Sequence, residues 1–297
     1  NARGTDALNT TAAEIAAKYG VKVTPVAGDI TTDAGRAAVL EAQDGQADIL
    51  VNNAGGPPPG KWTDWSRDDF IKAIDANMLT AVALMQALVP GMMDRGWGRV
   101  VNITSQSVRT PIAILGLSNT ARAGLTGFVA GMSRQVAASG VVVNNILPGI
   151  HATDRADSLD LGVSMAEGIS VEEARRRREQ TIPTHSYGLP EDFGATCAFL
   201  CSQHARFIIG QNILLDGGAS NISIIHYDVR TEPLSSKSSI PFAAQRITSC
   251  FKKLVVIYAC AVFVVVHTAL PDCGIFFFLF RCVLRKMFWS CGNRICI

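Results

Sequence analysis

The stretch Arg99-Val100-Val101-Asn102-Ile103-Thr104-Ser105 decides the fold of this chain. It is almost continuously apolar before its polar end, which is typical of a strand buried on both faces. A helical pattern follows from Ser118 to about Ser139, and a second apolar stretch covers residues 141–147. A strand, an amphipathic helix and another strand in this order predict a parallel sheet with helices on both faces.

The same alternation continues on the N-terminal side of this stretch. Strands are expected at residues 21–26 and 48–52, and helices at residues 7–20, 32–43 and from about Asp68 to Met93. Right-handed crossovers between the strands would give a doubly wound, Rossmann-like α/β sheet. Because the chain begins on a helix, we expect the first strand of such a sheet to be missing from it.

Composition separates a body, residues 1–220, from a tail, residues 221–297. From Ile225 onward there are nine basic and three acidic residues, so the pI of about 8.2 belongs to the tail and does not indicate nucleic-acid binding. The body contains Cys197 and Cys201, which we interpret as buried thiols on a helix rather than a metal site. No signal peptide opens the chain, and we expect a cytoplasmic body.

The tail contains two apolar runs, Leu254 to Leu270 and Ile275 to Phe280, with basic residues beside them. One interpretation is a membrane segment at residues 254–280, because 17 uncharged residues are at the lower limit for a span. The other, which we favour, is sequence translated past a true stop, because the α/β pattern is complete near Gly218.

Polar and small residues follow the predicted strands. Asp29, Asn53-Ala54-Gly55, Ser105 and Pro148-Gly149 each come where a strand ends. Ligands bind beyond the carboxyl ends of strands in such sheets, so these residues are expected to share one cleft.

The spacing of Ser105, Ser118 and Arg122 resembles the catalytic pattern of the short-chain dehydrogenase/reductase family. In that family a Tyr lies 13 residues after the Ser and a Lys four residues after the Tyr, so Ser118 and Arg122 here occupy the Tyr and Lys positions. Asn77, on the long helix, matches the family's Asn that holds a water in the proton relay. The resemblance therefore implies Asn77, Ser105, Ser118 and Arg122 as catalytic residues.

The resemblance implies NADP or NAD as cofactor, with a weak preference for NADP because Arg3 would offset a 2′-phosphate. Arg3 as a solvated terminal residue and Asp29 as a helix cap are the alternatives. The family's Gly-rich turn is absent, so the chain by itself is expected to bind dinucleotide poorly. The implied cofactor-binding residues are Arg3, Asp29, Ile30, Asn53, Ala54, Gly55, Arg122, Pro148, Gly149, Ile150 and Thr153.

Serine is a much weaker acid than tyrosine. Loss of general acid–base help typically lowers a rate by about 10²–10⁴. His151 is the only nearby group with a suitable pKa, although an ordinary loop histidine is the more economical interpretation.

The family places its variable substrate loop and lid in residues 150–187. Ser170 and Glu173 form a capping-box pattern, and Arg175-Arg176-Arg177-Arg178 follows. These cations could bind a phosphorylated carrier or a coenzyme A thioester, or they could pair with Glu172, Glu173 and Glu179 on a solvated face.

Our leading hypothesis is an NAD(P)-dependent oxidoreductase acting on a carbonyl or secondary alcohol, similar to a 3-oxoacyl thioester reductase. The alternative is a non-catalytic dinucleotide-binding or oligomer-forming member, because both the Tyr and the Lys positions differ. The family also implies a homo-oligomer. We expect no nucleic acid and no metal, and membrane association only through the tail.

Overall fold

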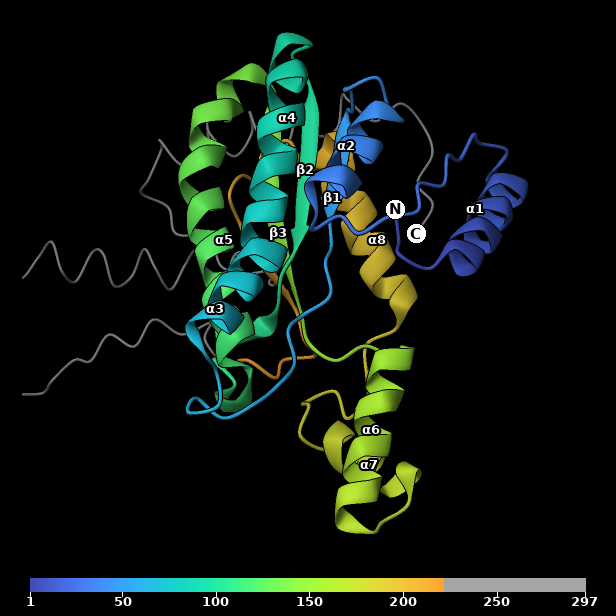
Figure 1. Ribbon diagram of the computed structural model, residues 1–297, viewed down its shortest axis with the longest axis vertical. Coiled ribbons are helices and arrows are strands. Elements are labelled where there is room, and N and C mark those ends of the chain that lie inside the picture. Colours follow the sequence, from blue (N-terminus) through green and yellow to red (C-terminus); the bar gives the residue numbers. More distant parts are fainter. Residues whose placement is uncertain (222–297) are drawn as a thin grey trace, which may run out of the picture. The chain divides into compact units, whose positions relative to one another are not determined.

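A four-stranded parallel sheet organises residues 1–221, the part of the chain that the computed structural model describes (Figure 1). Its strands are β1 (Ile49–Asn52), β2 (Gly98–Ile103), β3 (Val141–Pro148) and β4 (Asn212–Leu215), hydrogen-bonded in that order. All three neighbouring pairs are parallel. The predicted α/β class is confirmed.

The helices lie close to their predicted positions. They are α1 (Thr5–Tyr19), α2 (Asp33–Glu41), α3 (Arg67–Ile74), α4 (Thr80–Asp94), α5 (Gly116–Val136), α6 (Asp154–Glu167), α7 (Val171–Glu179) and α8 (Pro190–Cys201). A capping box between Ser66 and Asp69 begins α3, and a π-helical turn, η1 (Asp75–Leu79), joins α3 to α4. Short 3-10 turns cover Gln106–Val108, Ala113–Leu115, Ala137–Ser139 and Gln203–Ala205.

Alternate residues of the strands face two separate cores. Val100, Val141 and Val143 pack with side chains of α4 and α5. Val101, Ile103 and Ile146 pack instead with Leu200 and other side chains of α8. Because successive residues of a strand point to opposite faces, α8 covers the face opposite α4 and α5, as Figure 1 shows.

This arrangement corrects the expectation that all crossovers have the same hand. The strand order advances in one direction from β1 to β4, yet the first two crossovers lie on one face and the last on the other. With right-handed crossovers through α4 and α5, the connection through α8 is left-handed. Because of this change of hand, helices cover both faces of the described strands.

The predicted strand at residues 21–26 is wrong. The segment forms no strand, and only one isolated parallel bridge, between Ala2 and Ala27, lies beside it. The Asn1 side chain donates to the carbonyl of Val26 at 2.7 Å. A β-propensity pattern becomes a strand only where a neighbour pairs with it, and Pro25 cannot donate to such a ladder.

A row of asparagines crosses the whole sheet. Asn52 donates to Asn102 at 2.8 Å, Asn102 to Asn145 at 3.2 Å, and Asn145 to Asn212 at 2.7 Å. The four residues are paired in register, and the side chains of Asn102 and Asn145 are fully buried. This asparagine ladder fixes the strands within three residues of the ends that carry the site.

The continuous helix Arg67–Asp94 is, among the described helices, the one long and apolar enough to span a membrane. Met85, Leu88 and Met92 of this helix are buried in the core against the sheet, so it is a core helix.

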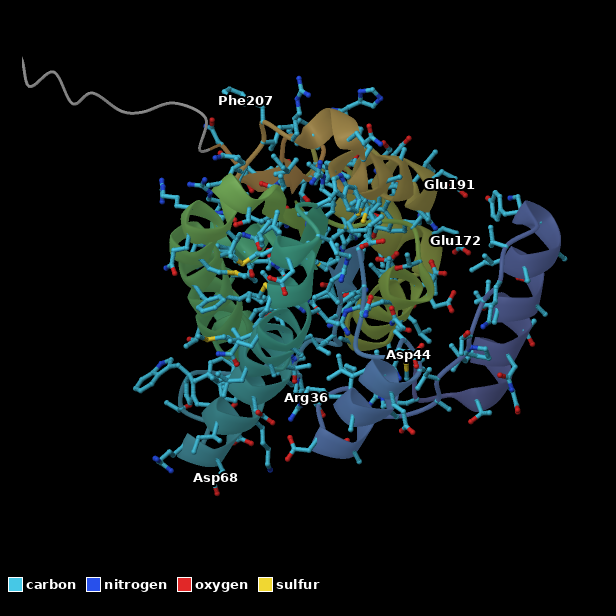
Figure 2. The ribbon with its side chains drawn as sticks, turned by 90° about the horizontal axis from the view of Figure 1, so that it is seen from above. Arg36, Asp44, Asp68, Glu172, Glu191 and Phe207 are labelled. Carbon is cyan, nitrogen blue, oxygen red and sulfur yellow. The ribbon has the colours of Figure 1, made fainter. Side chains whose placement is uncertain are left out.

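Charged residues such as Asp68, Glu172 and Glu191 lie at the periphery of the ribbon (Figure 2). The tail, with its predicted segment at 254–280, lies outside the described residues.

Candidate active site

The guanidinium of Arg122 joins three segments of the site. Its Nη1 donates to the carbonyls of Ile103 and Thr104, each at 2.9 Å, and its Nη2 to the carbonyl of Ala54 at 3.3 Å. Only 8% of Arg122 is exposed, and burial followed by the charge of Arg155 lowers the pKa of Arg122 to about 10. The arginine therefore stays charged at neutral pH and holds the ends of β1 and β2 against α5.

The fourth bond of Arg122 goes to Ser118. Its Nε donates to Ser118 Oγ at 3.2 Å, across one turn at the start of α5. Since a hydroxyl that accepts one hydrogen bond can still donate its own proton, Ser118 presents that proton away from Arg122. Ser118 and Arg122, which the spacing predicts at the Tyr and Lys positions, are thus directly hydrogen-bonded to each other.

Ser105 lies directly beyond β2, where it caps the 3-10 turn Gln106–Val108. Its Oγ accepts from the backbone N–H of Ser107 at 3.1 Å, so its hydroxyl proton also remains free to donate. The turn that Ser105 caps packs against α5, the helix that carries Ser118. The structure therefore brings Ser105, Ser118 and Arg122 to the same end of the sheet, as predicted.

Asn77 lies in the π-helical turn η1 and is 6% exposed. Its Nδ2 donates to the carbonyl of Gly55 at 3.0 Å, whereas its buried Oδ1 has no partner among the described residues. The predicted helix is confirmed, but the π-helical turn was not predicted, because it leaves the apolar pattern nearly unchanged. Such turns are frequent at functional sites.

Part of the predicted cofactor set lines one hollow of about 260 Å³ beside β1. Ile30, Asn53, Ala54 and Arg122 contribute to its wall, together with Asn77 of the predicted catalytic set. Two hydrogen bonds from Thr31 hold the pKa of Asp29 below its ordinary value, with a smaller contribution from the charge of Arg3. The side chain that caps α2 is that of Thr32, so the alternative role of Asp29 as the cap is wrong.

Pro148, Gly149, Ile150 and Thr153 lie at or after the end of β3 and outside this hollow, whereas Arg3 precedes α1 and Gly55 follows β1. The Gly149 N–H donates to the carbonyl of Leu215 at 2.8 Å, and a Cβ at Gly149 would lie 2.8 Å from Asp216 Cα. The carbonyl of Ile150 accepts from Gly188, and Thr153 precedes α6. Glycine at 149 is therefore required by a close approach of two backbones.

Neither of the two tyrosines in residues 1–221 is hydrogen-bonded to a predicted catalytic residue. Tyr19 is 63% exposed on α1, and Tyr187 donates its hydroxyl proton to Asp160 Oδ1 at 2.8 Å. Burial, reinforced by Asp160, raises the pKa of Tyr187 to about 12.

His151 Nδ1 lies 3.3 Å from the carbonyl of Gly149, and its ring packs edge-on against Phe193. This packing supports the loop interpretation of His151.

The arginines of α7 are paired rather than free. Arg175 pairs with Glu179, Arg176 and Arg177 pair with Glu173, and Arg178 pairs with the buried carboxylate of Asp160 at 2.8 Å. Ser170 accepts from the N–H of Glu173, but the Glu173 side chain turns to the arginines, so the predicted capping box is only half formed. The paired-face interpretation fits these contacts, with Glu173 and Glu179 as partners.

A second hollow, of about 490 Å³, was missed by sequence reasoning. Its lining includes Gly56, Trp65, Lys72, Asn77 and Leu117, so Asn77 is shared by both hollows. A Cβ at Gly116 would lie 2.3 Å from the Trp65 ring, so the indole packs directly on the start of α5. Gly116, close to Ser118, was the available signal, but nothing in the sequence indicates that Trp65 packs against it.

The chain matches known proteins over the described fold. Residues 2–220 match the family described as enoyl-(acyl carrier protein) reductase. The chain is 36% identical over 186 residues to acetoacetyl-CoA reductase of Cupriavidus necator, covering 60% of this chain and 68% of that protein. It is 34% identical over 179 residues to the 3-oxoacyl-[acyl-carrier-protein] reductase of Rickettsia felis, covering 58% and 66%, respectively.

A solved structure has the same fold. The L-sorbose reductase of Gluconobacter frateurii, crystallised with NADPH and L-sorbose, aligns with a TM-score of 0.71 at 28% identity and covers 74% of this chain and 85% of its own. Together with the family match over residues 2–220, this similarity establishes that the chain belongs to the short-chain dehydrogenase/reductase family.

Proposed function

We propose that this protein is an NADP-dependent reductase that converts a 3-oxoacyl thioester into the 3-hydroxyacyl thioester. The observation that carries the proposal is the hydrogen-bond set of Arg122, which assembles Ser118, the strand end before Ser105 and the Asn53-Ala54 loop into one site. Relatives named as acetoacetyl-CoA and 3-oxoacyl reductases supply the substrate class.

The residues present fit a dinucleotide on the β1 side of the site. Ile30, Asn53 and Ala54 line the first hollow, and the next residue, Gly55, lines the second, where an added Cβ would meet nothing within 4 Å. The unpartnered Oδ1 of Asn77 offers a buried acceptor to a ribose hydroxyl or a water. The nicotinamide cofactor supplies the hydride when bound.

We propose a second role for Arg122 beside the predicted binding of ribose. Four of the five N–H groups of a guanidinium are occupied by Ile103, Thr104, Ala54 and Ser118, which leaves one for a ribose hydroxyl. We infer that Arg122 mainly positions Ser118 and stabilises negative charge beside it.

Ser118 and Ser105 are the groups that handle the substrate oxygen. Both hydroxyls accept from the protein, at 3.2 Å and 3.1 Å, and so both can donate toward a carbonyl oxygen. Ser118 would transfer its proton as negative charge develops on that oxygen, with the adjacent guanidinium stabilising the serine oxygen left behind. A water in the hollow at Asn77 would restore the proton.

The test is oxidation of NADPH by the full-length protein with acetoacetyl-CoA, followed by loss of nicotinamide absorbance. L-sorbose serves as the comparison substrate, because it is the ligand of the solved relative. Turnover of acetoacetyl-CoA that disappears in Ser105→Ala is the expected result. Turnover of L-sorbose alone would show that the substrate is a ketose rather than a 3-oxoacyl thioester.

The non-catalytic alternative gains no support from the relatives, which are named as reductases. It predicts NADPH binding by calorimetry without turnover of any ketone. We further propose that the enzyme is cytoplasmic and homo-oligomeric. Sedimentation of the full-length protein tests the oligomeric state.

A further inference from the structure

We propose that the second hollow, which is lined by the loop after β1, by α3 and by the start of α5, binds the pantetheine arm of the substrate. This inference rests on the proposed function, because the arm belongs to coenzyme A and acyl-carrier thioesters. The hollow measures about 490 Å³, within the usual range of small-molecule sites. Leu117, the residue directly before Ser118, is part of its lining, so an arm in the hollow begins beside the proposed proton donor.

Trp65 provides a hydrogen-bond donor in the wall of this hollow. Its ring packs edge-on against Phe70, with centroids 6.2 Å apart, and also against Gly116 at the start of α5. Its indole N–H makes no hydrogen bond to any of residues 1–221. A Cβ at Gly60 would lie 2.8 Å from Trp65 Nε1, so the glycine leaves this N–H uncovered. An amide carbonyl of the arm would accept from it.

The loop that forms another wall of the hollow supplies acceptors. Residues 57–59 are three consecutive prolines, which have no N–H, so this wall offers mainly carbonyl groups. Among the described residues, no N–H or O–H group donates to the carbonyls of Gly56, Pro57 or Pro58. The amide N–H and hydroxyl groups of a pantetheine arm would donate to such carbonyls.

The charges around the hollow disfavour an anionic ligand. The ionisable side chains of its lining are Asp64, Asp69 and Lys72, which together carry one net negative charge. Hydrogen bonds from the side chain and backbone of Ser66 hold the pKa of Asp69 below its ordinary value, so this carboxylate stays ionised. A carboxylate or phosphate in the hollow would therefore be repelled.

The polar groups of the wall also disfavour a purely apolar ligand. An alkyl chain would displace water from the Trp65 N–H and from the loop carbonyls without replacing the hydrogen bonds that the water makes. A neutral arm that carries both amide donors and amide acceptors avoids the charge repulsion and replaces these bonds. The hollow is thus suited to pantetheine rather than to the acyl chain of the substrate.

The test compares two substrates that share the reacting ketone, acetoacetyl-CoA and the methyl thioester of acetoacetate, which lacks the arm. Trp65→Phe removes the indole N–H but keeps an aromatic ring. In the full-length protein with NADPH, it should raise KM for acetoacetyl-CoA about three- to tenfold with little change in kcat. KM for the methyl thioester should stay the same. The matched control is Trp62→Phe, which changes an 81% exposed tryptophan outside the lining and should leave both KM values unchanged.

Gly60→Ala is an independent variant in case Trp65→Phe does not fold, which circular dichroism checks. Its Cβ would cover the Trp65 N–H, so it should also raise KM for acetoacetyl-CoA and not for the methyl thioester. Equal changes for the two substrates, or no change for either, overturn the proposal. So does reduction of the methyl thioester alone.

Failure of the proposed function gives a different result. A wild-type protein that reduces neither thioester contradicts that function, and calorimetric titration with pantetheine in the presence of NADPH then decides the inference. Binding that Trp65→Phe weakens at least about threefold, and that Trp62→Phe leaves unchanged, supports the hollow as the pantetheine site. No binding by the wild type, or equal binding by wild type and Trp65→Phe, overturns it.

Discussion

Arg122 Nε lies 3.2 Å from Ser118 Oγ, and both side chains are more than nine-tenths buried. By its spacing from Ser105, we assign this pair to the two positions at which the family has a tyrosine and a lysine. A guanidinium bonded to a serine hydroxyl keeps a positive charge next to a proton donor, although the donor is short and weakly acidic. The chemistry of the site depends on this relationship, and the first two predictions test it.

Ser118→Ala is expected to lower kcat by about 10²-fold with little change in KM, because the lost group acts on the developing charge. Steady-state kinetics with acetoacetyl-CoA measure the split. The matched control is Ser133→Ala, which removes another buried serine near the opposite end of α5. This control should leave kcat unchanged. An equal loss in both variants would show that α5, rather than the Ser118 hydroxyl, is responsible.

Arg122→Lys is expected to destabilise the fold by about 2–4 kcal/mol, since an ammonium cannot reach all the carbonyls that the guanidinium bonds. Denaturant unfolding measures the change. The control is Arg134→Lys on the same helix, whose exposed side chain makes one hydrogen bond to Ala130. The control should remain within about 0.5 kcal/mol of the wild type.

Restored or increased turnover in Ser118→Tyr/Arg122→Lys would show that these positions limit proton transfer.

Asn102→Ala is expected to destabilise the protein by about 2–4 kcal/mol, because it leaves the amide of Asn52 and the amide oxygen of Asn145 without partners. Asn212→Ala removes the end of the ladder and should cost less, since only one bond is lost from a partly exposed residue. Chemical denaturation compares the two. If both variants lose the same free energy of unfolding, the central Asn102 contributes no more to stability than the single hydrogen bond at the end of the ladder.

Gly149→Ala is expected to be strongly destabilising, because its Cβ would lie 2.8 Å from the backbone of Asp216. Gly162→Ala, in α6, meets nothing within 4 Å and should stabilise the helix by up to about 1 kcal/mol. Thermal unfolding of both variants gives the comparison. Unchanged stability in Gly149→Ala would show that the β3 and β4 ends can move apart.

The hydroxyl of Tyr187 is expected to make the free energy of unfolding depend on pH in the alkaline range. Its pKa is about 12 in the folded protein and about 10 when unfolded, so the folded state holds the proton more tightly. The contribution is complete below pH 10 and is lost as the pH rises toward 12. The stability difference between wild type and Tyr187→Phe should therefore shrink over this range. A constant difference would place the effect in packing alone.

Sequence alone was enough to predict the α/β class, the parallel sheet, the helices, the strand end that precedes Ser105 and the helix that carries Ser118 and Arg122. These follow from hydrophobic period and residue spacing, which are local properties. The tertiary structure decided the rest. It removed the strand at 21–26, because pairing needs a neighbour, and it reversed the hand of the last crossover.

The tertiary structure also set the role of each polar group. Only a folded chain brings Arg122 to the carbonyls of Ala54, Ile103 and Thr104, which occupy three of its N–H donors. The asparagine ladder likewise joins residues that are far apart in the sequence. Spacing can place a side chain on an element, but hydrogen-bond partners across elements depend on packing, and packing is decided by the whole chain.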